Sequence, residues 1–220
     1  MLKADLHLHS KEDKLDLDIV YSAKELIDYA SKLGFEVLAF TFHRTRYYNE
    51  DLKKYAAKKG ILLIPGMEAL IEGSEVLLLN ITENPNVKTL DELRKYKQTH
   101  NIAVIAPHPF FPRFDCLHSK LIKNIDIFDG IEYSHFYIKP VNFNRKAART
   151  AKKYNLPLIG TSDAHKFSQM NHTYSLIDSK KNAKSVIESI RNGKVQLKTQ
   201  PLPFRLFLKL AFWLSIHLFD

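Results

Sequence analysis

The segment DLHLHS near the start of the chain holds two histidines, His7 and His9, two positions apart. Side chains in an extended strand alternate between its faces, so we expect Asp5, His7 and His9 to share one face. Leu6 and Leu8 would then lie on the other face. Two imidazoles at one strand end can bind one divalent ion, but the same pattern also occurs in pairs of buried, hydrogen-bonded histidines.

Later apolar runs also end in residues that bind metals. In chain order these are His43 after VLAFTF, Glu68 in ILLIPGME, His108 in IAVIAPHP, and Asp163 and His165 in LPLIGTSDAH. In parallel α/β folds the carboxyl ends of the strands form one rim, where sites are built from many loops. With one cysteine, Cys116, the chain cannot form a thiolate cluster or an internal disulfide framework. We therefore predict a metal centre of histidines and carboxylates.

Short apolar runs alternate with stretches of helical periodicity, which is typical of βα units. Two helices are marked by capping boxes, Ser22 with Glu25 and Thr89 with Glu92, and would cover 22–34 and 89–101. Two further helices are expected over 140–154 and 182–192, and an extra strand over 75–80. The main strands are expected over 2–8, 36–41, 61–65, 102–106, 129–133 and 157–161. This order favours parallel strands in a barrel or an open doubly wound sheet.

Composition indicates a globular chain without long disordered or membrane-spanning parts. The 220 residues can form one sizeable core, 45% are hydrophobic and 26% are charged. The net charge of +9 favours an anionic partner, or serves solubility. The charged N-terminal segment lacks a signal-peptide pattern, which predicts a cytoplasmic location. GxGxxG, GxxxxGK[ST] and GxSxG patterns are absent, so nucleotide-cofactor and serine-hydrolase functions have no support.

The segment 203–219 is the exception in composition, because it is apolar with scattered polar residues. It is short for a bilayer span, which needs about 20 apolar residues. Arg205, Lys209, Ser215 and His217 do not share one helical face. We expect either a helix packed on the barrel or at a dimer contact, or an interfacial anchor that makes the protein peripheral to the membrane. Accordingly we divide the chain into a main domain, 1–200, and a C-terminal helix, 201–220.

The segments DLHLHS, FTFH, PGME, APHP, GIEY and GTSDAH resemble the successive motifs of the PHP (polymerase and histidinol phosphatase) superfamily. The resemblance covers residues 4–178, and its first and last motifs are specific in order and separation. It implies a distorted (β/α)7 TIM-like barrel with the metal site at the carboxyl ends of the strands. It further implies two or three divalent ions (zinc, manganese or iron) and hydrolysis of phosphomonoesters or phosphodiesters.

The resemblance also implies roles for individual residues. One ion would be held by His7, His9, Glu68 and Asp163; a second by Glu68 and His108; a third by His43 and His165. Glu132 in GIEYSH would add a ligand, with His135 as its rival. The residues expected to act directly in catalysis are His7, His9, Glu68, Asp163 and His165.

The sequence departs from the family pattern at two places. An aspartate often precedes the histidine that corresponds to His43, and here that residue is Phe42. The acid expected after HxH has three candidates in KEDKLDLD, namely Asp13, Asp16 and Asp18. We also expect Asp5 to orient His7 or to be structural. Arg44 and Arg113 would either grip a substrate phosphate or be ordinary surface residues.

Chemistry at such a site follows from the ions. A divalent ion lowers the pKa of bound water from 15.7 to about 7, and paired ions hold both attacking and leaving oxygens. The expected substrate is a phosphorylated small molecule, a nucleotide or a nucleic-acid end. The alternative is a non-catalytic nucleic-acid-binding or assembly subunit, for which the basic charge would account. The sequence leaves the oligomeric state open.

Overall fold

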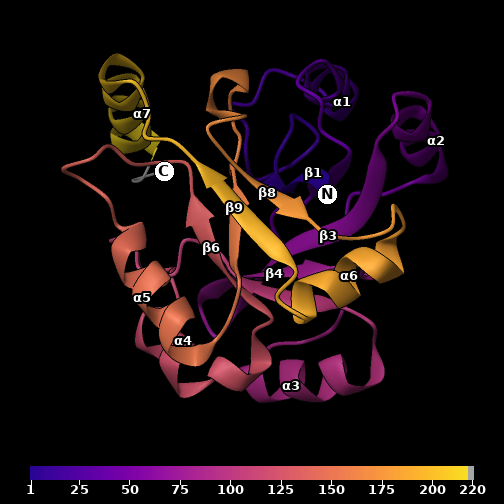
Figure 1. Cartoon of the computed structure of the whole chain (residues 1–220), viewed down its shortest axis with the longest axis vertical. Helices are drawn as coiled ribbons and strands as arrows, with labels where there is room; N and C mark the ends of the chain where they lie inside the picture. Colours follow the sequence, from indigo (N-terminus) through magenta and orange to yellow (C-terminus); the bar gives the residue numbers. More distant parts are fainter. Residues whose placement is uncertain (218–220) are drawn as a thin grey trace.

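The chain folds around a sheet with nine strands in the computed structural model, which describes residues 1–217, with side chains to residue 213 (Figure 1). Residues 218–220 of the predicted tail lie outside this part. The sheet order is β7-β6-β5-β4-β3-β2-β1-β8-β9. The strands are β1 Leu2–Leu8, β2 Val37–Phe40, β3 Leu62–Ile71, β4 Ser74–Leu79, β5 Ala103–Ala106, β6 Gly130–Ser134, β7 Leu158–Thr161, β8 Thr173–Ile177 and β9 Val195–Thr199.

Strand directions differ from a regular (β/α)7 barrel. The pairs β1–β2, β2–β3, β5–β6 and β6–β7 are parallel, as expected. However, β4 is antiparallel to both β3 and β5, and β8 is antiparallel to both β1 and β9. The turn between β3 and β4 is short, with Glu72 and Gly73 at positive φ, so the chain returns as a hairpin without a crossover helix. The expectation of seven βα units is therefore wrong in this detail, although the α/β barrel architecture holds.

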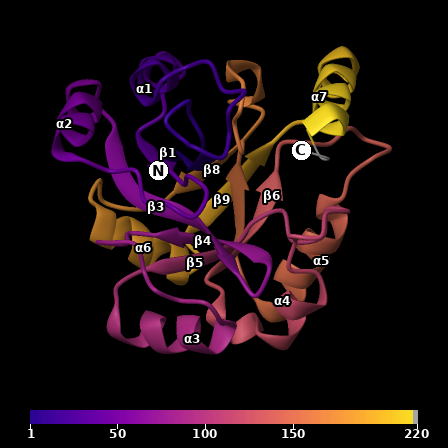
Figure 2. The same cartoon turned by 180° about the vertical axis from the view of Figure 1, so that it is seen from behind.

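Helices cover the outside of the sheet, as Figures 1 and 2 show from opposite sides. They are α1 Ala23–Lys32, α2 Glu50–Lys58, α3 Leu90–Thr99, α4 Ser119–Lys123, α5 Asn144–Tyr154, α6 Ala183–Arg191 and α7 Phe204–His217. The capping boxes at Ser22 and Thr89 form as predicted. Sequence reasoning gave no helix over α2 or α4, and no strand over β8 or β9.

The two ends of the sheet approach each other and nearly close it. The Ser175 hydroxyl on β8 accepts a hydrogen bond from the Gly160 N–H on β7 and donates one to the Gly160 carbonyl. A Cβ at Gly160 would lie 2.5 Å from the Tyr174 carbonyl oxygen, so only glycine permits this approach. Leu8 at the end of β1 also bridges Ala164 after β7. This near-closure brings the first and last predicted metal-binding segments together.

Alternate residues of the strands fill the inside of the barrel. Val37, Ala39, Leu77 and Leu79 are members of this buried cluster, together with residues of α6. The helix lies at the amino ends of the parallel strands, because Arg191 bonds the Ile102 carbonyl just before β5. Two other buried clusters lie under the outer helices. One end of the barrel is thus sealed by apolar packing, which leaves the carboxyl ends of the strands for polar side chains.

Strand β1 contains an irregularity that corrects the expected alternation. Asp5 pairs with Leu38 and Leu8 with Phe40, so three steps along β1 match two along β2, as in a β-bulge. Leu6 belongs to the interior cluster, whereas Leu8 packs in the cluster under α1 and α2. The prediction that these two leucines share a face is wrong. The extra residue reverses the phase of the strand, which turns His7 and His9 toward the barrel mouth.

The C-terminal helix α7 packs on the barrel through one side. Leu210 is buried with Ile138 and Leu202, and Phe207 stacks on Phe136 at 4.8 Å between ring centres. Within the described residues, none of the helices combines the length and apolarity needed to cross a bilayer. The division of the chain at residue 200 stays a prediction.

Candidate metal centre

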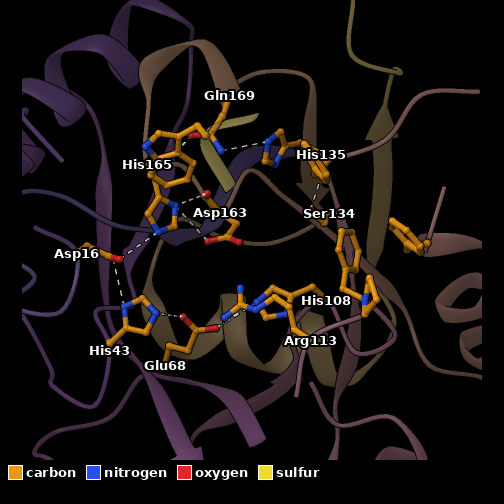
Figure 3. A pocket seen from close by; sticks show the side chains of 15 residues that line it. Asp16, His43, Glu68, His108, Arg113, Ser134, His135, Asp163, His165 and Gln169 are labelled. Carbon is orange, nitrogen blue, oxygen red and sulfur yellow. Dashed lines mark hydrogen bonds and ion pairs between the residues drawn. The ribbon is translucent and has the colours of Figure 1, made fainter. Parts of the chain in front are cut away.

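A pocket of about 280 Å³ opens at the carboxyl ends of the strands, with acids and imidazoles on one side and aromatic rings on the other (Figure 3). Each of the eight predicted ligands belongs to a group of ligand atoms within 4.8 Å of one another. These residues are His7, His9, His43, Glu68, His108, Glu132, Asp163 and His165. The structure therefore brings the predicted positions together from six strand ends.

The deeper part of the site, which we call the inner group, consists of His7, Glu68, His108 and Glu132. His7 Nε2 lies 3.2 Å from Glu68 Oε2, and His108 Nε2 lies 3.4 Å from Glu68 Oε1. The opposite nitrogen of His7, Nδ1, lies 2.8 Å from Glu132 Oε1. Glu132 also accepts the Thr161 hydroxyl and the His108 backbone N–H. Both oxygens of Glu132 thus have partners, and the carboxylate fixes the orientation of the His7 ring.

The shallower part, the outer group, consists of His9, Asp13, Asp16, His43 and His165. Asp16 Oδ2 lies 3.0 Å from His9 Nδ1 and 3.2 Å from His43 Nδ1. Asp16 Oδ1 lies 3.4 Å from His165 Nε2. Asp13 Oδ2 lies 3.1 Å from Nδ1 of His9 and of His43, and also accepts the His43 backbone N–H. Of the three candidate acids, Asp13 and Asp16 join the site, whereas Asp18 is exposed and is in none of the groups.

Glu68 and Asp163 connect the two groups. Glu68 Oε2 lies 3.3 Å from His43 Nε2, in addition to its approach to His7. Asp163 Oδ1 lies 3.4 Å from His7 Nε2 and 3.5 Å from His9 Nε2. Both carboxylates therefore face imidazoles of the inner and of the outer group, which is the position of a bridging ligand.

The donor atoms fit divalent ions better than they fit one another. His9 Nε2, Asp16 Oδ2 and Glu68 Oε1 are buried and make no hydrogen bond within the described part of the chain. They have charged neighbours at 3.0 to 3.5 Å, but buried polar atoms that make no hydrogen bond are costly, so a ligand is expected there. Around a tetrahedral ion with bonds of 2.0–2.1 Å, neighbouring ligand atoms lie roughly 3.3 Å apart. The nitrogen-to-oxygen distances of 3.2 to 3.5 Å around Glu68 match that spacing.

The pKa values of the site residues also indicate that positive charge is required between the carboxylates. Burial alone would raise the pKa of Glu68, but the imidazoles of His7, His108 and His43 outweigh it and hold this pKa well below its usual range. Burial would likewise lower the pKa of His43, yet Asp13 and Asp16 raise it to about 11. Without metal the carboxylates would thus be ionised and neutralised by protonated histidines. Divalent ions can replace those protons.

The backbone is strained where two of these side chains enter the pocket. His108 has φ of 24° and Asp163 has φ of 45°, in the left-handed region that residues with a Cβ rarely adopt. Non-glycine residues in this region cluster at functional sites, where the surroundings stabilise them. The two turns re-aim the chain after β5 and β7, and so direct these side chains across the barrel mouth.

Glu75 is a site residue that sequence reasoning missed. It is the second residue of β4, and its carboxylate lies 3.6 Å from His108 Nε2 and 3.3 Å from Arg113 Nη2. Burial, with Glu68 nearby, raises the pKa of Glu75 to about 7. The available signal was an acid directly before the apolar run VLLL in a short hairpin. The strand expected over 75–80 begins with this acid, but the sequence alone does not show that its side chain reaches the site.

The remaining candidates differ in position. Arg113 lines the pocket and is paired with Glu75 and Asp115, whereas Arg44 is exposed. His135 also lines the pocket, and burial lowers its pKa to about 4, so it is a neutral imidazole. Asp5 accepts the backbone N–H groups of His7 and Ser162 and does not contact the His7 ring, so it has the structural role that was one of our two expectations.

Comparison with known proteins supports this architecture. A family model described as PHP-associated matches residues 141–195. The uncharacterized protein MJ1587 of Methanocaldococcus jannaschii is 30% identical over 145 residues, which are 62% of this chain and 83% of that protein. The family-model match covers only part of this chain, whereas the match to MJ1587 spans most of that protein.

Solved structures share the fold at low sequence identity. PsfC from Pseudomonas syringae PB-5123 has a TM-score of 0.67 and 15% identity, covering 96% of this chain and 97% of that one. A proposed metal-dependent phosphoesterase from Bifidobacterium adolescentis has a TM-score of 0.57 at 14% identity, covering 74% and 87%. An amidohydrolase from Chromobacterium violaceum with bound sulfate has a TM-score of 0.58 at 16% identity, with the same coverage.

These matches agree with the ordered motifs, which the fold gathers at one barrel mouth. The PHP-associated match over residues 141–195 supports a place for this chain in the PHP superfamily, and the 30% identity to MJ1587 shows that the two chains are related over most of that protein.

Proposed function

We propose that this protein is a metal-dependent hydrolase of phosphoesters. The observation that carries the proposal is the pair of carboxylates, Glu68 and Asp163, each facing imidazoles of both groups. Such bridging acids are expected where two or three ions lie close together. Zinc, manganese and iron all accept sets of histidine and carboxylate. When bound, such ions activate water and offset the charge of a transferring phosphoryl group.

Other residues of the chain would orient the metal-binding histidines and bind the substrate phosphate. Glu132 orients His7 through Nδ1, so that Nε2 faces Glu68 and Asp163. Arg113 lies at the pocket, where its guanidinium, held by Glu75 and Asp115, can donate to phosphate oxygens. Because Glu75 and Asp115 already contact its guanidinium, Arg113 is held in place before a substrate arrives. This preorganisation favours a phosphoester over a neutral ester or amide.

The aromatic wall of the pocket, opposite the acids, would contact the part of the substrate next to the phosphate. Phe111 and Phe143 line it with rings 5.3 Å apart, and Trp213 lines the pocket next to His165. A wall of this kind accepts an apolar or planar group next to the phosphate. Phosphorylated small molecules with such a group and nucleotide or nucleic-acid ends are the candidate substrates.

The test is hydrolysis of aryl phosphomonoesters and bis-aryl phosphodiesters by chelated protein reloaded with zinc, manganese or iron. We expect turnover that depends on the ion and that falls to background in His9→Ala and His165→Ala. A His100→Ala variant is the matched control, because it makes the same change at a histidine that is in none of the candidate metal groups and does not line the pocket. Absence of turnover with all three ions, on both ester types, would refute the proposal.

The non-catalytic alternative has a distinct signature. Single-stranded RNA binding that weakens steeply with salt and is unchanged by chelation, in protein without ester hydrolysis, would favour a nucleic-acid-binding subunit.

A further inference from the structure

Helix α7 has two apolar sides, one packed on the barrel and one largely exposed to solvent. The packed side carries Leu206, Phe207 and Leu210 against Ile138 and Leu202. The other side carries Phe204, Leu208 and Phe212, which are 63%, 50% and 69% exposed. Their spacing of four residues aligns them along the helix. Single exposed apolar residues are ordinary, but an aligned row of three large ones indicates a contact surface.

Two cations accompany this row. Arg205 and Lys209 are exposed and follow Phe204 and Leu208 by one position, so they lie beside the row. The sequence from Phe204 to His217 contains no acidic residue, and the net charge of the chain is +9. Figures 1 and 2 show α7 at a corner of the molecule, apart from the other helices. The surface formed by Phe204, Arg205, Leu208, Lys209 and Phe212 is called the outer face of α7 below.

We propose that the outer face of α7 binds the surface of an anionic lipid bilayer. Large apolar side chains next to Lys and Arg are the combination by which a helix lies in the bilayer interface. Among the described residues no helix is long and apolar enough for a span across the bilayer, so contact with its surface is the arrangement that we consider. A second copy of the chain fits less well, because it would bring Arg205 and Lys209 toward the same cations without an acid from either helix. Anionic headgroups match both features of the face at once.

The position of α7 gives this contact a consequence for the site. Trp213, on the same helix, lines the pocket, and its ring centre lies 5.7 Å from that of His165. Lys166 Nζ lies 4.8 Å from the Trp213 ring. A bilayer on the outer face would therefore lie beside the pocket mouth. The binding itself does not depend on hydrolysis, so it can hold or fail separately from the proposed function.

The experiment is co-sedimentation of the full chain with vesicles of phosphatidylcholine alone and of equal parts phosphatidylcholine and phosphatidylglycerol. We expect binding to the anionic vesicles that weakens with added salt, and little binding to the neutral ones. Neutralising the cations in R205Q/K209Q should weaken binding on the order of 30-fold, from the attraction of two basic residues to an anionic surface. The double variant F204E/L208E should weaken it by about tenfold or more.

A matched control is Ile122→Glu, which places the same charge at an exposed apolar residue of α4. It should bind like the unaltered chain, and all variants should keep the same melting temperature within a few degrees. Hydrolysis of a soluble ester by F204E/L208E should be unchanged, since neither residue lines the pocket. Failure of the unaltered chain to bind anionic vesicles would overturn the proposal. So would a concentration-dependent dimer that the same substitutions dissociate while vesicle binding is absent.

Discussion

The inner and outer groups contain the same kinds of side chain but hold them differently. In the inner group each imidazole has its far nitrogen occupied, His7 by Glu132 and His108 by the Cys116 sulfur, 3.5 Å away. These residues come from strands or from the residues that directly follow them, and are at most 5% exposed. In the outer group His43 and Asp16 are 21% and 15% exposed, and both acids come from the single loop after β1.

This difference predicts that the two groups differ in how firmly they hold ions. Ligands oriented by second contacts lose less freedom when a metal binds, which raises its affinity. We expect the inner group to retain its ion through dilution and gel filtration, and the outer group to exchange its ion with solvent. The predictions below test this division.

The largest effect is expected at the residue that connects the groups. Glu68→Gln keeps the size of the side chain but removes the charge shared by His7, His43 and His108. We expect loss of tight binding in both groups and a fall in kcat/KM of at least about 10³. Metal content by mass spectrometry and steady-state hydrolysis measure it. A variant that loses metal from only one group would show that Glu68 does not bridge.

A smaller and selective effect is expected at Asp16, which belongs only to the outer group. Asp16→Asn should remove one equivalent of metal and lower kcat on the order of 10²-fold, while the inner ion stays. Asp18→Asn is the matched control, since it makes the same change in the same loop at an exposed residue outside the candidate groups. If Asp16→Asn released all bound metal, the two groups could not be treated separately.

Glu132→Gln tests the orientation of the inner group. The amide can still accept the His108 N–H but no longer attracts a proton on His7 Nδ1. We expect the affinity for the inner metal to fall by about 10- to 100-fold, with the outer metal little changed. Competition with a calibrated chelator measures both. A complete loss of inner metal would instead indicate that Glu132 is itself a ligand, as the family resemblance implied.

The smallest effect is a pH dependence of the outer group. The acids raise the pKa of His43 from 6.5 to about 11, so its ring is protonated at neutral pH in the chelated protein. That ion-pair stabilisation is complete below pH 6.5 and is lost as pH rises toward 11. A metal must displace this proton, so its apparent affinity should rise with pH, by at most about tenfold per unit for each proton released. Calorimetry in buffers of different ionisation enthalpy counts these protons, and zero released protons would contradict the assignment.

Sequence reasoning was accurate where one local pattern decides the outcome. The capping boxes at Ser22 and Thr89 placed α1 and α3, and the apolar runs placed the buried parallel strands. Sequence reasoning failed where a segment forms a strand because of the strands that it pairs with. Residues 173–177, TYSLI, carry no clear alternation and form β8 by pairing with β1 and β9. Residues 195–199, VQLKT, do alternate apolar and polar residues, but this short signal was not recognised as β9.

At the site, the convergence of strand ends was predictable because parallel strands share a rim. The roles of the acids were not predictable, because the spacing of residues in a loop does not show where their side chains point. Asp13 and Asp16 are chosen over Asp18 by the path of the loop, and Glu75 enters through a hairpin that the (β/α)7 expectation did not contain. The assignment of ions to these ligands remains a prediction.

The bulge in β1 makes the centre separable from the barrel that carries it. From β1 the interior core needs only the side chains of Ala4 and Leu6 to point inward. Ala4 comes before the bulge, and Leu6 lies within it. Deleting one residue between Asp5 and Leu8 would restore regular pairing and keep Leu8 opposite Phe40, but it would leave no place at the mouth for the imidazole of His7 beside that of His9. A lineage could therefore lose the chemistry in a single step without losing the fold, and a designer could reverse that step by inserting one residue.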